Sequence, residues 1–173
     1  MKSAATVRRG KTAAPDGAPG RIWLIRHAHA LDADVDALRR LSKRGRRQVR
    51  ALARCLGAHD GFQPAEIWHS PLVRARQTAE LLTRHLAFDG SPVRVADIMP
   101  GDAPRTVARR LKTLRHSVAL VGHEPHLSAL ASLLVAGQAT PALFVLKKCA
   151  ALALERGAGR WVVRWVVSPE ILP

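Results

Sequence analysis

The sequence predicts one α/β domain of three layers, in which helices cover both faces of a largely parallel, mixed sheet. From residue 21 onward, short apolar runs alternate with amphipathic stretches of helical length, and this alternation is typical of a parallel sheet. Near the C-terminus, two apolar runs flank the turn residues "RGAGR" and predict an antiparallel hairpin at one edge. A chain of 173 residues, 47% of them hydrophobic, is long enough for one such core and too short for two ordinary domains.

Composition divides the chain into a leader and this domain. Residues 1–20 are rich in Ala, Gly, Pro and charge without periodicity, so we expect a disordered basic leader there and the folded domain over residues 21–173. The sequence contains neither an apolar stretch of membrane-spanning length nor the apolar region of a secretory signal. We therefore expect a cytoplasmic protein, a monomer or a weak dimer, in which Cys55 and Cys149 are reduced thiols.

Continuous apolar runs predict the strands, because strands of a parallel sheet are buried on both faces. The runs "RIWLIRHA", "AEIWHS" and "SVALVGHE" are the clearest, and "VRVADI" is weaker. The run "ALFVLKKCAALALE" predicts an interrupted strand in the final hairpin. The predicted strands cover residues 21–28, 65–70, 93–98, 117–124, 142–155 and 160–168.

Four helices are predicted between these strands, each from apolar residues at helical spacing and from residues that favour helix ends. In the first helix, Val49, Leu52, Ala53 and Leu56 form the apolar face. The second starts with a Ser-Pro pair, which is typical of a cap followed by the first helical residue. The predicted boundaries are Ser42 and Gly57 for the first helix, Ser70 and Pro71 for the start of the second, Pro104 and about Arg115 for the third, and Pro125 and Gly137 for the fourth.

Polar residues follow three of the predicted strands. Arg26 and His27 follow the first, Arg74 lies one turn into the helix after the second, and His123 follows the fourth. Ligands of such sheets bind at the C-terminal ends of the strands, so we expect these four side chains to converge. Two arginines and two histidines would form an anion pocket, and guanidinium groups match the oxygens of a phosphoryl group.

A histidine in this pocket can act as a nucleophile toward phosphorus. Neutral imidazole has a free lone pair near pH 7, whereas a serine hydroxyl needs a base. The remaining cationic groups would stabilise charge on the phosphoryl oxygens, which is most of what phosphoryl transfer requires of a protein. This chemistry needs no metal and no cofactor, so we expect neither.

The motifs "LIRHAHA", "SPLVRARQTAE" and "VALVGHEPHL" resemble the three signature segments of the histidine phosphatase superfamily, which has the phosphoglycerate mutase-like fold. The RHA form of the first motif, the stretch "MPGDAP" and the ending "VVSPEILP" look like SixA-type phosphohistidine phosphatases. The resemblance covers roughly residue 22 to the C-terminus. It implies that His27 is the phosphorylated nucleophile, that Arg26 and Arg74 bind phosphoryl oxygens, and that His123 completes the pocket.

The resemblance also implies the substrate, which would be phosphohistidine on a signalling or phosphocarrier protein. Larger relatives use a glutamate as general acid, and the nearest candidate here is Asp97 by its order along the chain. Imidazole leaves from phosphohistidine more readily than an alkoxide leaves from an ester, so such a substrate needs less help from an acid. A phosphatase that acts on a small phosphate ester is the alternative.

Other readings of the same residues stay open. His29 and His126, together with His27 and His123, could supply four imidazoles to zinc or iron, although the nearby arginines would repel a cation. Ser70 is interpreted as a helix cap rather than a catalytic hydroxyl. The three acidic residues after the first strand lack the glycine and glutamate of a calcium loop and are interpreted as a solvated loop: Asp32, Asp34 and Asp36.

A non-catalytic basic binding module is the alternative outside enzymes. The net charge is +15, and the stretch "SKRGRRQVR" predicts a basic helix. With three phenylalanines and no tyrosine, aromatic platforms for stacking bases are scarce, so nucleic acid is not the expected partner. The basic helix is instead expected to be solvated or to steer an acidic phosphoprotein toward the pocket.

Overall fold

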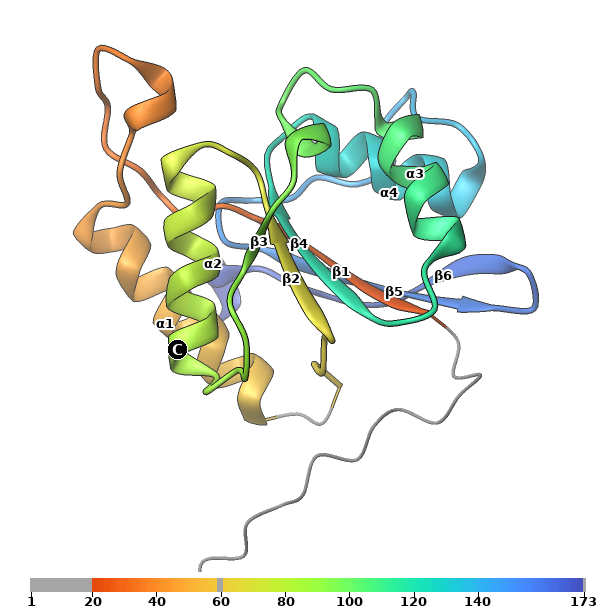
Figure 1. Ribbon diagram of the computed structural model, residues 1–173, viewed down its shortest axis with the longest axis horizontal. Helices are drawn as coiled ribbons and strands as arrows, with labels where there is room; N and C mark the ends of the chain where they lie inside the picture. The colour runs from red at the N-terminus through yellow and green to blue at the C-terminus, as the bar shows by residue number, and fades with distance from the viewer. Residues whose placement is uncertain (1–19, 59–60, 173) are drawn as a thin grey trace, which may run out of the picture.

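The computed structural model describes residues 20–58 and 61–172 (Figure 1). Six strands form one sheet in the order β3-β2-β4-β1-β5-β6. β3, β2, β4 and β1 are parallel, whereas β5 and β6 pair antiparallel, so the predicted mixed sheet is confirmed. Apart from Gly20, the predicted leader lies outside the described residues. The strands are β1 (Arg21–Arg26), β2 (Glu66–His69), β3 (Val93–Arg94), β4 (Val118–Gly122), β5 (Ala151–Gly157) and β6 (Arg160–Val167).

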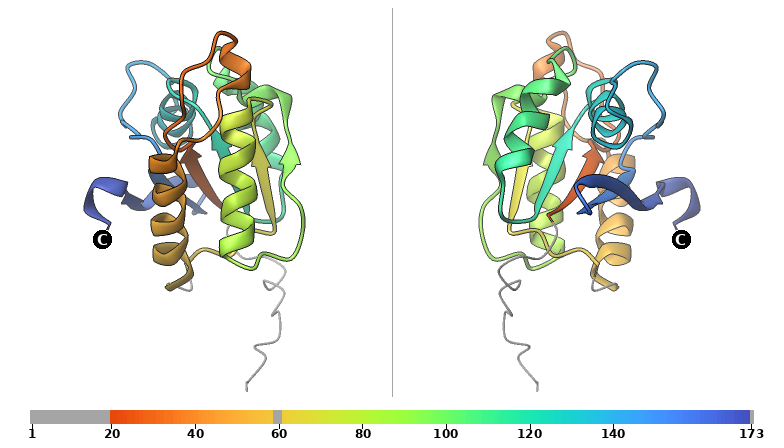
Figure 2. Two further views of the ribbon diagram at one scale, coloured as in Figure 1. Left: turned by 90° about the vertical axis from the view of Figure 1, so that its left-hand side faces the viewer. Right: turned by 90° about the vertical axis from the view of Figure 1, so that its right-hand side faces the viewer.

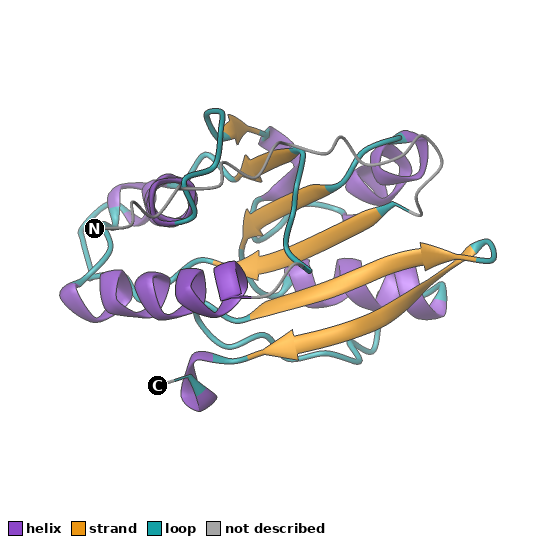
Figure 3. Cartoon of the chain, turned by 90° about the horizontal axis from the view of Figure 1, so that it is seen from below, coloured by secondary structure: helices purple, strands orange, loops and turns teal. Residues whose placement is uncertain are grey.

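Helices cover both faces of this sheet, as Figures 2 and 3 show. Apolar residues of α1 and α2 pack on one face, and those of α3 and α4 pack on the other. The three-layer α/β/α architecture predicted from the sequence is therefore confirmed. The helices are α1 (Lys43–Ala58), α2 (Val73–His85), α3 (Pro104–Thr113) and α4 (His126–Ala136), with short 3-10 turns η1 (Asp36–Leu38), η2 (Ala96–Ile98) and η3 (Pro169–Ile171).

The first strand divides its side chains between the two cores. Ile22 and Leu24 belong to the core under α3 and α4, and Trp23 and Ile25 belong to the core under α1 and α2. This alternation follows from the period of two along a strand. Each of these side chains contributes roughly 1.5–3 kcal/mol by leaving water, so β1 is held firmly where it enters the site.

Two strand predictions were too long. β3 covers only two residues, because its partner β2 ends at His69 and the last ladder bond joins the Val95 amide to the His69 carbonyl at 2.9 Å. The strand predicted from residue 142 begins at Ala151. Before it, Cys149 has φ of 64°, and its amide bonds the Arg26 carbonyl at 3.1 Å, so the chain turns over the end of β1 instead of extending.

The predicted helix boundaries are partly right. Ser42 caps α1 through a 3.0 Å bond from the Gly45 amide, and Gly137 ends α4 with φ of 79°. Gly57, however, lies inside α1. α2 begins at Val73 with Leu72 as the N-cap residue, so the predicted start of α2 at Ser70 and Pro71 was wrong. Within the described residues, the structure contains no helix long and apolar enough to cross a membrane.

Candidate functional site

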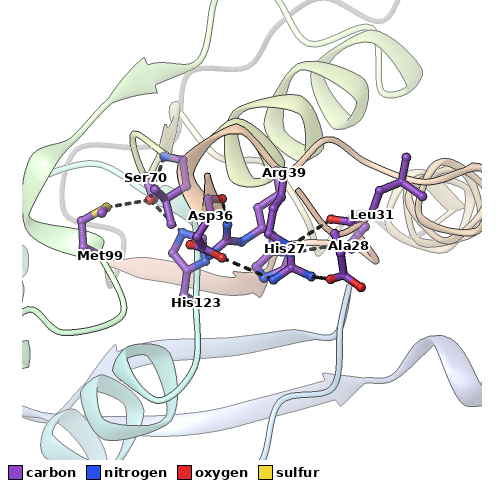
Figure 4. A network of polar contacts seen from close by, with 11 residues as sticks. His27, Ala28, Leu31, Asp36, Arg39, Ser70, Met99 and His123 are labelled. Atoms are coloured by element: carbon purple, nitrogen blue, oxygen red, sulfur yellow. Dashed lines mark hydrogen bonds and ion pairs between the residues drawn. The ribbon is translucent and has the colours of Figure 1, made fainter. Parts of the chain in front are cut away.

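The ends of β1 and β4 bring the two predicted histidines together. The register pairs Arg26 with Gly122, and a histidine follows each of these residues. The ring centroids of His27 and His123 are 5.0 Å apart (Figure 4), and the His27 amide donates to the Gly122 carbonyl at 2.9 Å. Loops that follow β1, β3 and α4 rise around the same edge of the sheet (Figure 2). The predicted convergence of the ends of the first and fourth strands is therefore present.

The side chain of His27 is held in one tautomer. Its Nδ1 lies 2.7 Å from the Ala28 carbonyl oxygen, which only accepts, so Nδ1 carries the proton and Nε2 keeps its lone pair. The side chain is 7% exposed. Burial, together with the cations Arg74 and Arg26, lowers the pKa of His27 from 6.5 to about 4. His27 is thus neutral near pH 7, which is the state that a nucleophilic imidazole needs.

Arg74 is fixed by the start of α2. Thr78, one turn further along the helix, donates its hydroxyl to the Arg74 carbonyl at 2.7 Å and accepts from the Ala28 amide at 3.1 Å. These bonds hold the helix against the residue that follows His27, and the Arg74 side chain is only 6% exposed.

Arg26 and Arg74 each have one buried N–H group that donates no hydrogen bond to the described residues. In both side chains this group is Nε–H. Arg26 uses Nη1 to donate to the Leu146 carbonyl at 2.8 Å. A buried donor on a charged group costs folding free energy when it makes no hydrogen bond. Such a donor therefore indicates that a ligand or a water molecule accepts its hydrogen bond. An oxyanion between the two guanidinium groups would do so.

His123 completes the same pocket and adds a residue that sequence reasoning missed. Its side chain is 2% exposed, and its Nε2 lies 2.8 Å from the Ser70 hydroxyl oxygen. Burial, followed by His27 and Arg74, lowers the pKa of His123 to about 3.

The Ser70 hydroxyl also accepts from the Leu72 amide at 3.3 Å and lies 3.4 Å from the Met99 sulfur. Ser70 therefore orients His123, and the interpretation of Ser70 as a helix cap was wrong because α2 starts later. The position of Ser70 directly after β2 was the sequence feature that could have predicted this role.

Asp36 reaches the pocket from the loop that the sequence predicted to be solvated. Its carboxylate accepts from Arg74 Nη2 at 3.0 Å, and its backbone carbonyl accepts from Arg74 Nη1 at 2.8 Å. Arg39 lies 3.4 Å from the same carboxylate and 2.8 Å from that of Asp32 (Figure 4). The hydrogen bond from Arg74 is the largest cause that lowers the pKa of Asp36. Two of the Arg74 donors thus bind a carboxylate and a carbonyl where phosphoryl oxygens are expected.

The remaining predicted residues make no side-chain hydrogen bond to His27, Arg74 or His123 within the described residues. His29 bonds Ser42 through Nδ1 at 2.9 Å. His126 is 2% exposed on α4 and is one of the groups that lower the pKa of His123. Over residues 20–58 and 61–172, no group of three or more His, Cys, Asp or Glu side chains could hold a metal ion. The four-histidine site considered from the sequence is therefore not assembled. Asp97 lies half-buried in η2, with no hydrogen bond or ion pair to the described pocket residues.

Glu124 is a partly buried titratable residue next to His123 to which the sequence-based prediction gave no role. It follows His123 directly, and burial raises its pKa, while Ser128 and Arg26 act in the opposite direction. A carboxyl group with a raised pKa beside a reactive centre can donate a proton. Its position after the strand-end histidine was the sequence signal for it.

Comparisons with known proteins agree with this geometry. Residues 22–98 match the model of the histidine phosphatase superfamily, branch 1. The structure is similar to that of the protein histidine phosphatase SixA complexed with tungstate, with a TM-score of 0.77 and 25% identity over 86% of this chain and 97% of that chain. No curated protein sequence matches the chain.

Two further solved structures share the fold. A protein of Agrobacterium tumefaciens assigned as phosphohistidine phosphatase SixA has a TM-score of 0.72 and 24% identity, over 87% of this chain and 99% of that chain. A mycobacterial glucosyl-3-phosphoglycerate phosphatase has a TM-score of 0.65 and 20% identity, over 86% and 99% of the two chains. The same architecture therefore occurs in proteins whose names refer to different phosphate compounds, and the substrate has to be argued from the site itself.

The lowered pKa values predict that both pocket histidines stay neutral under mildly acidic conditions. An unhindered imidazole titrates near pH 6.5, whereas His27 and His123 should take up protons only as the pH falls toward about 4 and about 3. Ring nitrogen resonances followed by NMR, and assigned with His27→Asn, should show His27 at about pH 5.5 as the neutral tautomer with the proton on Nδ1. A midpoint at or above 6.5 would contradict the assigned environment.

The contact between Asp36 and Arg74 predicts competition with oxyanions. Asp36→Asn removes the charge but keeps the size of the side chain, so tungstate should bind about two- to tenfold more tightly. Asp32→Asn is the matched control, because it removes the same charge from the same loop and Asp32 pairs with Arg39. Calorimetric titration of both variants with tungstate separates the loss of the Asp36–Arg74 contact from the loss of one negative charge in the loop. Equal affinities for tungstate would show that only the overall charge matters.

Proposed function

We propose that the chain is a member of the histidine phosphatase superfamily and acts as a metal-independent, SixA-type phosphohistidine phosphatase. Its substrate is a phosphohistidine on a signalling or phosphocarrier protein. The observation that carries the proposal is the state of His27, whose proton is held on Nδ1 by the Ala28 carbonyl at 2.7 Å and whose Nε2 is free. The arginines Arg26 and Arg74 and the imidazole of His123 surround this nucleophile.

The proposed reaction has two phosphoryl transfers. In the first, Nε2 of His27 attacks phosphorus, and the P–N bond to the substrate imidazole breaks. The substrate ring leaves as a neutral imidazole, since its other nitrogen carries a proton, and His27 becomes a phosphorylated imidazolium. In the second, water attacks the phosphorus and the P–N bond of phosphorylated His27 breaks. Dihydrogen phosphate leaves with both protons of the water, and neutral His27 is regenerated.

The cationic groups act on the oxygens of the transferred group. Arg74 is buried and always charged, so its guanidinium can stabilise charge on the equatorial oxygens without rearrangement. Nδ1 of His123 has no hydrogen-bond partner within the described residues, while its Nε2 is oriented by Ser70. When a phosphoryl dianion enters, a proton on His123 would be stabilised by that charge, and Nδ1 would become a further donor.

Phosphohistidine is favoured as the substrate because donor and acceptor of the first step are both imidazoles. This step is nearly symmetric and needs no strong proton donor, whereas an alkoxide leaving group does. Asp36 is the carboxylate that touches the pocket, and Arg74 lowers its pKa, so Asp36 stays ionised. Such a group is a poor general acid near pH 7.

A phosphatase for small phosphate esters is the second candidate, and Glu124 is the observation that favours it. Burial raises the pKa of Glu124, which lies next to His123 in the chain. A carboxyl group whose pKa is raised could donate a proton to the alkoxide that leaves from an alkyl phosphate ester. Asp97 is the weaker candidate, since it makes no hydrogen bond or ion pair with the described pocket residues.

The proposal is tested by phosphate release from a phosphohistidine-bearing carrier protein in the presence of EDTA. The wild type should release phosphate, and His27→Ala should lower kcat/KM by at least about 10³-fold, because the nucleophile is lost. His85→Ala is the control, since His85 is an exposed histidine at the end of α2. Loss of wild-type activity in EDTA, or full activity of His27→Ala, would contradict the proposal.

Variants of the two carboxyl groups distinguish the candidate substrates in the same assay. Asp97→Asn and Glu124→Gln should change turnover of the phosphohistidine protein by less than about threefold, because no acid is required. A chain that prefers an alkyl phosphate ester, and loses that activity in Glu124→Gln, would instead be an ester phosphatase.

A further inference from the structure

A second cavity adjoins the phosphoryl pocket. It has a volume of about 320 Å³ and shares Arg26 with the pocket, and we call it the basic cavity. Four cationic side chains line it, against one carboxylate, that of Glu170. The cationic residues are Arg26, Arg44, Lys147 and Lys148.

The fold brings the two lysines to Arg26 through backbone bonds at the end of β1. The Cys149 amide donates to the carbonyls of Arg26 and His27 at 3.1 and 3.2 Å, and the Arg26 amide donates to the Ala150 carbonyl at 3.0 Å. Residues 147 and 148 precede this junction directly. The lysines are thus held beside the phosphoryl pocket by main-chain geometry rather than by their own flexible side chains.

The start of α1 supplies the opposite wall of the basic cavity. The His29 amide donates to the Gln48 side chain at 3.0 Å, and His29 Nδ1 lies 2.9 Å from the capping Ser42 hydroxyl. A Cβ at Gly45 would overlap the His29 carbonyl, so only glycine permits this close approach. Arg44 lies in the same first turn, which contains no acidic residue to balance it.

Within the described residues, the positive charge of the basic cavity is only partly balanced, because Glu170 is the one carboxylate against four cations. Among the described residues, no carboxylate forms a salt bridge with Arg26, Arg44, Lys147 or Lys148. Burial, and then the neighbouring arginines, lower the pKa of Lys148. Cations held together at the cost of mutual repulsion favour an anionic ligand.

Exposed apolar side chains flank the pocket on two loops and indicate a macromolecular ligand. Leu31, Val35 and Leu38 are 55%, 54% and 59% exposed on the loop after β1, and Leu143 and Val145 are 55% and 80% exposed on the loop after α4. Each loop bonds one phosphoryl-binding arginine: Asp36 bonds Arg74, and Leu146 bonds Arg26. Apolar groups beside unpaired charges are typical of protein interfaces.

We propose that the basic cavity binds an acidic side chain of the partner protein, an Asp or Glu that lies next to the phosphohistidine. The inference rests on the proposed function for its substrate and names the feature that the substrate must carry. The apolar loops then contact the surface around that residue. The basic cavity thereby selects acidic phosphohistidine sites over neutral ones.

The test uses two short peptides that carry a central phosphohistidine flanked either by glutamates or by glutamines. The wild type should have a kcat/KM at least about fivefold higher for the acidic peptide, as two exposed charge contacts would give. In the double variant Arg44→Gln/Lys148→Met this ratio should fall to about one. The control is Arg105→Gln/Arg109→Gln, which removes the same charge from exposed positions of α3 and should keep the wild-type ratio.

A second measurement does not depend on turnover. In an NMR titration with the unphosphorylated peptides, the acidic one should bind the wild type more tightly and shift the side-chain amide signals of Gln48. Equal binding of both peptides, or equal losses in the two double variants, would overturn the inference. Absence of hydrolysis of both phosphopeptides, with the selective binding retained, would instead count against the proposed function alone.

Discussion

The parallel register between β1 and β4 is the constraint on which the site depends. A histidine directly follows each of these strands, and the pairing of Arg26 with Gly122 brings the two histidines side by side. The His27 amide continues the ladder with a hydrogen bond to the Gly122 carbonyl at 2.9 Å. A slip of one residue would turn one imidazole toward the opposite face of the sheet. Such a slip is opposed by the two cores, because it would also exchange the side chains that β1 buries on its two faces.

The lowered pKa values of the two pocket histidines follow from their burial at the paired ends of β1 and β4. Two imidazoles are removed from water beside two guanidinium groups, and burial is the largest cause of the lowered pKa of both. The free protein therefore keeps His27 and His123 neutral near pH 7 beside two guanidinium groups, which leaves the pocket attractive to an anion and leaves His27 in the state that the proposed reaction needs. In the free protein, Asp36 satisfies part of this attraction through Arg74, and we expect a bound oxyanion to replace it.

Much of the site could be predicted from the sequence because its residues directly follow buried apolar runs. His27, His123 and Arg26 needed only the assignment of strands and the rule that parallel strand ends meet. The roles of Asp36 and Ser70 could not be predicted in this way. Asp36 reaches Arg74 across a loop whose path depends on tertiary contacts. Ser70 bonds His123 instead of capping the helix, because α2 starts two residues later than the Ser-Pro pair indicates.

Locating the phosphoryl group on the enzyme tests the proposed nucleophile most directly. A phosphoenzyme trapped during turnover, and kept alkaline because phosphohistidine is labile in acid, can be examined by ³¹P NMR and by mass spectrometry of its peptides. We predict a single phosphoryl group on Nε2 of His27, since the proton on Nδ1 bonds the Ala28 carbonyl. A phosphoryl group on Nδ1, or on any other residue, would contradict this prediction.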